Sequence, residues 1–121
     1  MTTRDHDAFP HRKLDVCRVA REAMVVADRM ARGLPRGYAT LADQLRRSSQ
    51  SAYLQSVEGA ARSGAEQLLR FRGARAEACE AAGVVEGLLD LKVVDPAKAE
   101  ELIGLLGRVA AMLTKMSGLR S

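Results

Sequence analysis

The sequence has few aromatic residues and no tryptophan. Its 121 residues include two Phe and two Tyr, although 47% of the chain is hydrophobic. Sheet proteins draw on aromatic and β-branched side chains, whereas close-packed helices can be built from Ala, Leu and Val. The shortage of aromatic residues therefore favours an all-α fold, and the length fits one domain with a single core. It also argues against sequence-specific recognition of single strands, which uses aromatic stacking platforms.

Cysteine and long hydrophobic runs are also scarce. Cys17 and Cys79 lie far apart without a CxxC spacing, so they indicate neither a zinc site nor a redox pair. We expect two buried free thiols of a reducing compartment, with a meeting of the two across helices as the less favoured alternative. Hydrophobic runs fall short of the roughly 20 residues of a membrane span, and residues 1–13 lack the apolar core of a signal peptide. We therefore expect a cytoplasmic protein without membrane contact.

Histidine does not occur after His11, which removes most catalytic chemistries. A di-iron bundle needs Glu-x-x-His, and a serine nucleophile needs a base within the fold. A glycine-rich phosphate loop with its lysine is also missing. His6 and His11, near Asp5 and Asp7, fall in an N-terminal tail that we expect to be disordered. The sequence thus predicts no enzyme, no metal site and no cofactor.

Four segments after this tail carry apolar residues at alternating three- and four-residue steps, the pattern of helices. Their expected limits lie near Gly33, Thr40, Ser63, Lys92 and Asp95. Thr40 and Asp95 have the chemistry of helix caps, and Ser63 with Glu66 has the spacing of a capping box. The connection between the second and third helices fits a tight reversal or a kink.

Short connections between amphipathic helices predict an antiparallel up-down-up-down four-helix bundle. We assign residues 1–11 to a polar N-terminal tail, 12–117 to the bundle and 118–121 to a C-terminal tail.

The expected inward faces follow from the same periodicity. On the first helix the face holds Leu14, Cys17, Ala20, Met24, Ala27 and Ala31. On the second it holds Leu41, Leu45, Ser48 or Ser49, Ala52 and Ser56, with the serine hydroxyls bonded to carbonyls of their own helix. On the third it holds Phe71, Ala74, Ala78, Ala81, Val85 and Leu88, and on the fourth Leu102, Leu105, Val109, Met112 and Met116. The first helix is apolar nearly all round, through Val16, Ala23, Val25, Val26 and Met30, which indicates a second surface for self-association.

Lysine is scarce too, with four Lys against fifteen Arg in a chain of net charge +4. A GC-rich genome gives this bias, and so does selection for phosphate or carboxylate partners. Residues 46–75 have a local net charge of +4, with six candidate nucleic-acid-binding residues: Arg46, Arg47, Arg62, Arg70, Arg72 and Arg75. One interpretation is contact with the RNA or DNA backbone. The other is a scaffold in which Arg46, Arg47 and Arg62 pair internally with Glu58, Glu66 or Glu80. Glu58 and Arg62 would meet along one face if the helix continued through Gly59.

The stretch QLRRSSQSAYLQSVEGAAR carries a family resemblance. It is similar to the helix-two motif of the bacterial four-helix-bundle proteins encoded in intervening sequences of 23S rRNA genes, and PHRKLDVCRVAREA is similar to that family's opening. The matching motif residues include Gln44, Arg46, Arg47, Ser51, Glu58, Gly59 and Arg62. Gln67 and Arg70 stand where the family has two phenylalanines.

The resemblance implies a homopentameric ring without established enzymatic activity. It assigns Gln44, Ser51, Glu58 and Gly59 to a structural motif. The accessory proteins of diversity-generating retroelements, which are similar in fold, are associated with nucleic acid and a reverse transcriptase. The partners that we expect are therefore further copies of the chain, RNA or DNA, and a reverse transcriptase.

Overall fold

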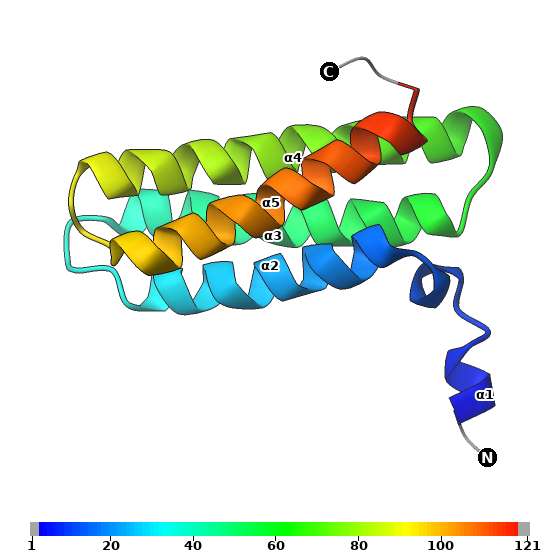
Figure 1. The fold of residues 1–121 in the computed structure, drawn as a ribbon, viewed down its shortest axis with the longest axis horizontal. Helices are drawn as coiled ribbons and strands as arrows, with labels where there is room; N and C mark the ends of the chain where they lie inside the picture. The colour runs from blue at the N-terminus through cyan, green and yellow to red at the C-terminus, as the bar shows by residue number, and fades with distance from the viewer. Residues whose placement is uncertain (1–2, 119–121) are drawn as a thin grey trace.

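The protein consists of helices over the residues that the computed structural model describes, 3–118, with side chains described for 5–118. The elements are α1 (Thr3–His6), the 3-10 helix η1 (Pro10–Lys13), α2 (Asp15–Arg32), α3 (Ala39–Ala60), α4 (Gly64–Asp90) and α5 (Pro96–Met116). Figure 1 shows the four long helices side by side, with α1 and η1 extending from one end of the bundle.

Consecutive long helices run in opposite directions, because short connections join them at alternate ends (Figure 1). α2 packs against α3 and α5, and α4 packs against the same two helices. The prediction of an all-α four-helix bundle is confirmed. The starts of α2 and α4 and the ends of α3 and α5 share one end of the molecule (Figure 1). We call this the 61–63 end, after the residues that connect α3 to α4.

The core is built mainly from alanine, valine and leucine around one buried phenylalanine, Phe71. All six residues predicted for the inward face of α4 are buried. On α5 the predicted Leu102, Leu105 and Val109 are buried. Met112 and Met116 are half-buried, and Leu106 and Leu113 are fully buried instead. Leu106 and Leu113 each follow a predicted position by one residue, so the buried face is rotated to one side of the predicted stripe, where α5 packs against both α2 and α4.

The inward face of α2 also differs from the prediction. Met24 and Leu14 are half-buried, whereas Val16 and Ala23, expected outside the core, lie inside it. The extra apolar surface on this helix is therefore smaller than predicted. Val25 remains 41% exposed, and Val26 and Met30 are half-buried.

Three buried serines on α3 satisfy their hydroxyls within the helix, as predicted. Ser48 Oγ donates to the Gln44 carbonyl at 2.7 Å, Ser49 Oγ to the Leu45 carbonyl at 2.8 Å and Ser56 Oγ to the Ala52 carbonyl at 2.7 Å. The sequence left open whether Ser48 or Ser49 faces inward, and in the structure both are buried. Leu41, predicted inside, is half-buried, and Ala42 is buried instead. The small side chains let α3 approach α4 closely: an added Cβ on Gly59 would lie 2.6 Å from Phe71 Cε1.

One of the three predicted helix caps is present. The Asp95 carboxylate accepts a hydrogen bond from the Lys98 amide at 3.0 Å, which caps α5. Thr40 is not a cap, because α3 begins one residue earlier, at Ala39. The Ser63 side chain forms no cap hydrogen bond, so the predicted capping box with Glu66 is wrong.

The α3–α4 connection is a tight reversal, not a kink. Gly64 adopts a φ of +59°, a left-handed conformation that a side chain would strain. Gln67 supports the turn, since its Nε2 donates to the carbonyls of Gly59 at 3.0 Å and Arg62 at 2.7 Å. The Gln67 amide therefore holds the end of α3.

The segment that we expected to be disordered carries structure in its described part. α1 and η1 are helical, and η1 contacts both α2 and α3. At the other terminus Ser117 is buried, and its hydroxyl donates to the Leu113 carbonyl at 2.6 Å. Of the predicted tails, residues 1–2 and 119–121 lie outside the described residues. Between residues 3 and 118, the helices are too short or too polar to cross a membrane.

Candidate functional site

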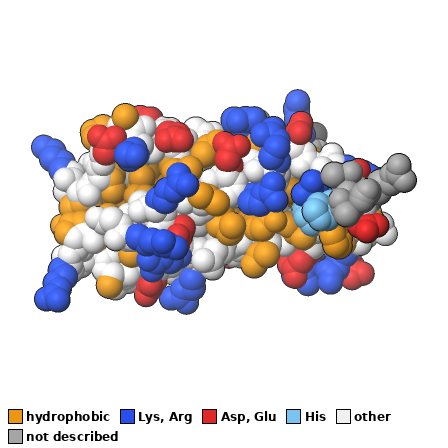
Figure 2. Space-filling model, turned by 90° about the horizontal axis from the view of Figure 1, so that it is seen from below, with side chains coloured by type: hydrophobic (Ala, Val, Ile, Leu, Met, Phe, Trp, Pro, Cys, Tyr) orange, Lys and Arg blue, Asp and Glu red, His pale blue; other side chains and the backbone are white. Residues whose placement is uncertain are grey.

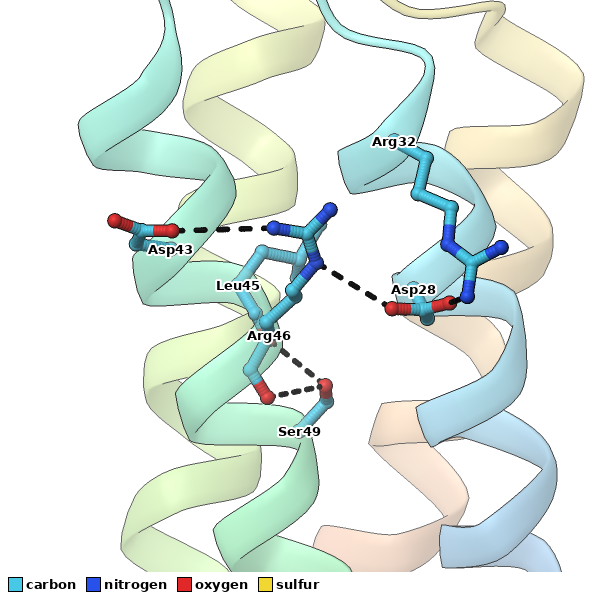
Figure 3. A network of polar contacts seen from close by, with 6 residues as sticks. All are labelled: Asp28, Arg32, Asp43, Leu45, Arg46 and Ser49. Atoms are coloured by element: carbon cyan, nitrogen blue, oxygen red, sulfur yellow. Dashed lines mark hydrogen bonds and ion pairs between the residues drawn. The ribbon is translucent and has the colours of Figure 1, made fainter.

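Arg46 lies between α2 and α3 in a network of polar contacts (Figure 3). Its Nε is 3.4 Å from Asp28 Oδ1 on α2, and its Nη1 is 3.9 Å from Asp43 Oδ1 on α3. Arg32 also binds Asp28, with 2.9 Å between Nη2 and Oδ2. Two carboxylates thus surround Arg46, and neither belongs to the glutamates that we expected as its partners. The side chain holds α2 to α3 and has little free charge to offer a phosphate.

Arg47 points to a different face, an open groove of about 580 Å³ between α3 and α4. Glu58, Glu77 and Glu80 line the same groove, so its carboxylates outnumber the guanidinium. Gln44 and Ser51 of the family motif also line it. Gln44 Nε2 donates to Glu80 Oε2 at 3.4 Å, and Ser51 Oγ accepts from Gln55 Nε2 at 3.0 Å. The excess of negative charge makes this groove unsuited to a phosphate.

Arg62 and Arg70 lie at the 61–63 end. Arg70 Nη1 is 3.9 Å from Glu58 Oε1, a long contact between side chains that are 40% and 47% exposed. Glu58 therefore faces Arg70 and not Arg62, because α3 ends at Ala60 before Arg62 can share its face. Arg62 is exposed and forms no ion pair with a described carboxylate.

Arg72 and Arg75 reach from α4 to the end of α5. Arg75 Nε donates to Thr114 Oγ1 at 2.7 Å, and Arg72 Nη2 donates to the Ser117 carbonyl at 3.5 Å. Both acceptors are uncharged, so these hydrogen bonds fix the guanidinium groups without neutralising them. Lys115, in the last turn of α5, is exposed and adds positive charge to this end.

The six predicted arginines therefore do not form one patch. Arg46 and Arg47 lie on two different faces of α3, and the other four gather at the 61–63 end. Adjacent positions on a helix diverge by about 100°, which is why a charge count along the sequence overstates the cluster.

The structure also brings together basic residues that the sequence pattern did not single out. A hollow of about 160 Å³ at the 61–63 end is lined by His11, Arg12, Cys17, Arg18, Arg21 and Tyr53. They come from η1, the first turns of α2, and α3. The three-residue step from Arg18 to Arg21 was a visible signal of a shared helix face. His11 stood in the segment expected to be a disordered tail, and Arg12 stood at the first residue assigned to the bundle.

The two cysteines lie in contrasting environments. Cys17 is buried at this hollow, and burial raises the pKa of its thiol from 9.0 to about 11. The thiol is therefore neutral at physiological pH. Cys79, which we expected to be buried, is exposed on α4. In the part of the chain that the structure describes, three or more His, Cys, Asp or Glu side chains do not gather as a metal site would require.

A comparison with known protein families identifies a family whose sequence model matches this chain. The sequence model of the 23S rRNA-intervening sequence proteins matches residues 12–115, from η1 to the last turn of α5. No curated protein matches the sequence significantly. Since the match covers all four long helices and the fold is the helical bundle that the motif predicts, the chain belongs to the 23S rRNA-intervening sequence protein family.

Proposed function

We propose that this protein is a non-enzymatic, self-associating helical bundle of the cytoplasm that binds the backbone of RNA or DNA. The observation that carries the proposal is the positive charge left free at the 61–63 end. Arg72 and Arg75 bond uncharged oxygens of α5, and Lys115 is exposed in the last turn of α5. Guanidinium groups held in place with their charge intact are suited to phosphate oxygens.

Self-association is supported by apolar side chains on the outside of the bundle. Leu54 on α3 is 55% exposed and Leu69 on α4 is 66% exposed. Repetition of the basic end in a ring would multiply its charge and its pull on a polyanion. A homopentamer, which the family motif implies, is the assembly that we propose.

Light scattering after size exclusion tests both parts of the proposal. We expect a mass of about five chains, and we expect the particle to bind RNA at low salt and release it as salt rises. A monomer would contradict the assembly, and a ring that ignores nucleic acid at low salt would contradict the binding function.

A pair of matched variants tests which end binds. Arg72→Gln with Lys115→Gln should reduce the salt dependence of binding, by about 0.7 in the slope of log K against log salt for each single-strand phosphate that is no longer neutralised. Arg29→Gln with Arg36→Gln removes the same charge from exposed positions at the opposite end, in the last turn of α2 and in its connection to α3. Equal effects of the two pairs would contradict a site at the 61–63 end.

A scaffold that binds no nucleic acid is the second candidate, and the Arg46 network favours it. There the guanidinium serves to join two helices, with Asp28 at 3.4 Å and Asp43 at 3.9 Å. A double-mutant cycle with Arg46→Ala and Asp28→Ala separates the two functions. Coupled loss of stability in a protein that never binds nucleic acid would support the scaffold, whereas unchanged binding in the folded double variant would support the backbone-binding function.

A further inference from the structure

The hollow at the 61–63 end has the chemistry of an anion site. Arg12, Arg18 and Arg21 line it together with His11, and no carboxylate lines it among the side chains of residues 5–118. Arg18 Nη2 lies 3.9 Å from Asp15 Oδ1, and Arg18 Nη1 lies 3.7 Å from Glu22 Oε1. Both are long contacts between exposed groups. Arg12 and Arg21 are exposed and form no ion pair among the described side chains. Two guanidinium groups are therefore free to bind a phosphate, with the third available to turn toward it.

The wall of the hollow is compatible with a phosphate as well. η1 contacts both α2 and α3 here, so the basic groups come from separate elements and converge. The Cys17 thiol remains neutral because burial raises its pKa to about 11, so it places no negative charge beside the anion. Figure 2 shows histidine and basic side chains close together at the end of the bundle from which the N-terminal segment extends.

Aromatic side chains accompany these arginines. Tyr53 lines the hollow itself. The Phe9 ring stacks on His11, with 5.8 Å between centroids and 26° between planes, and Phe9 is 54% exposed. A chain with only four aromatic residues thus places two of them beside its basic hollow. Exposed rings next to arginines are the features by which proteins hold single strands, because every base can stack on a ring.

We propose that this hollow binds a single-stranded nucleic acid, with a backbone phosphate held by Arg12, Arg18 and Arg21 and an adjacent base stacked on Phe9. The inference rests on the proposed function and names its ligand more closely. A duplex cannot use Phe9, because its bases are already stacked. The site reads no sequence, since a phosphate and a ring face are common to all nucleotides.

Fluorescence anisotropy of the full-length protein with labelled RNA and DNA oligonucleotides of about twelve nucleotides tests the phosphate site. Arg12→Gln with Arg21→Gln should lower the salt slope by roughly 1.4, as expected when two positive charges no longer neutralise the backbone. Arg29→Gln with Arg36→Gln, an equal loss of exposed charge at the opposite end, should leave the slope near that of the wild type. Circular dichroism checks that each variant is folded.

Phe9 variants test the stacked base. Phe9→Ala should weaken single-strand binding about fivefold or more, Phe9→Tyr should restore it, and binding to a duplex of the same length should not change. Equal losses on duplex and single strand would overturn the stacking. If Arg12→Gln with Arg21→Gln reduces binding no more than the control pair does, the hollow is not the binding site, and the proposed function still stands. A wild-type protein that binds neither RNA nor DNA would overturn both.

Discussion

At the scale of single residues, Gly59 shows how the absence of a side chain lets two helices approach closely. A Cβ at this position would meet the buried ring of Phe71, with 2.6 Å to Cε1 and 2.7 Å to Cδ1. Gly59→Ala should therefore destabilise the protein by about 1–3 kcal/mol, as overpacking does. In contrast, Gly83 lies within α4 with open space around its missing Cβ. Gly83→Ala should stabilise the protein by about 0.5–1 kcal/mol through helix propensity. Urea unfolding measures both, and changes of the same sign would contradict the packing described here.

Cys17 provides a second prediction at this scale. Its thiol has a pKa of about 11 in the folded protein against 9.0 in the unfolded chain. The unfolded state therefore loses its proton first, so the stability contributed by the neutral thiol is complete below pH 9 and is lost as pH rises toward 11. In that window the free energy of unfolding should fall by about 1.4 kcal/mol per pH unit from this group. Cys17→Ala should show a flatter pH dependence than the wild type, whereas Cys79→Ser, at an exposed site, should retain the wild-type slope.

At the scale of helices, the start of α5 has a cap and the start of α4 does not. The Asp95 carboxylate accepts from the Lys98 amide at 3.0 Å, whereas the Ser63 side chain makes no such bond. Asp95→Ala should cost about 1 kcal/mol of stability, with Asp95→Asn close to the wild type. Ser63→Ala should change the free energy of unfolding by only a few tenths of that amount, because it removes no hydrogen bond. A larger loss for Ser63→Ala than for Asp95→Ala in thermal or urea unfolding would show that the capping box forms after all.

At the scale of the whole molecule, salt should affect the stability of the fold and the affinity for nucleic acid differently. The ion pairs between described residues are largely at the surface, and most are longer than 3.3 Å. Exposed pairs of this kind contribute little to stability. The melting temperature should therefore change little between about 0.05 and 0.5 M salt, a range that screens exposed charges strongly. Nucleic-acid affinity should fall steeply over the same range. Differential scanning fluorimetry and anisotropy on one preparation test this, and parallel losses of stability and affinity would indicate that salt acts through unfolding.

Much of the helical architecture could be predicted from the sequence. The three- and four-residue steps of Phe71, Ala74, Ala78, Ala81, Val85 and Leu88 identified the buried face of α4 completely. The serines of α3 were assigned to the core with their hydroxyls bonded to their own helix, and the structure agrees. These features are local, because periodicity and short side chains act within one helix.

The candidate site depended on contacts that no local pattern contains. Asp28 and Arg46 are eighteen residues apart and meet only because α2 packs against α3. Likewise Arg75 donates to Thr114 across thirty-nine residues, which leaves its charge free, while Arg47 shares a groove with Glu77 and Glu80 of α4. The hollow lined by Arg12, Arg21 and Tyr53 combines three elements, and one of them, η1, begins within the tail that was expected to be disordered.

The sequence by itself determined the number, order and approximate ends of the long helices and the family to which the chain belongs. Hydrophobic spacing, proline and glycine act over one or two turns, so they can be read without a structure. Tertiary structure alone decided which arginines are neutralised by carboxylates and which remain free at the 61–63 end. Charge neutralisation depends on distances of a few ångström between helices, and such distances are set by packing around Phe71, Gly59 and the alanine-rich core.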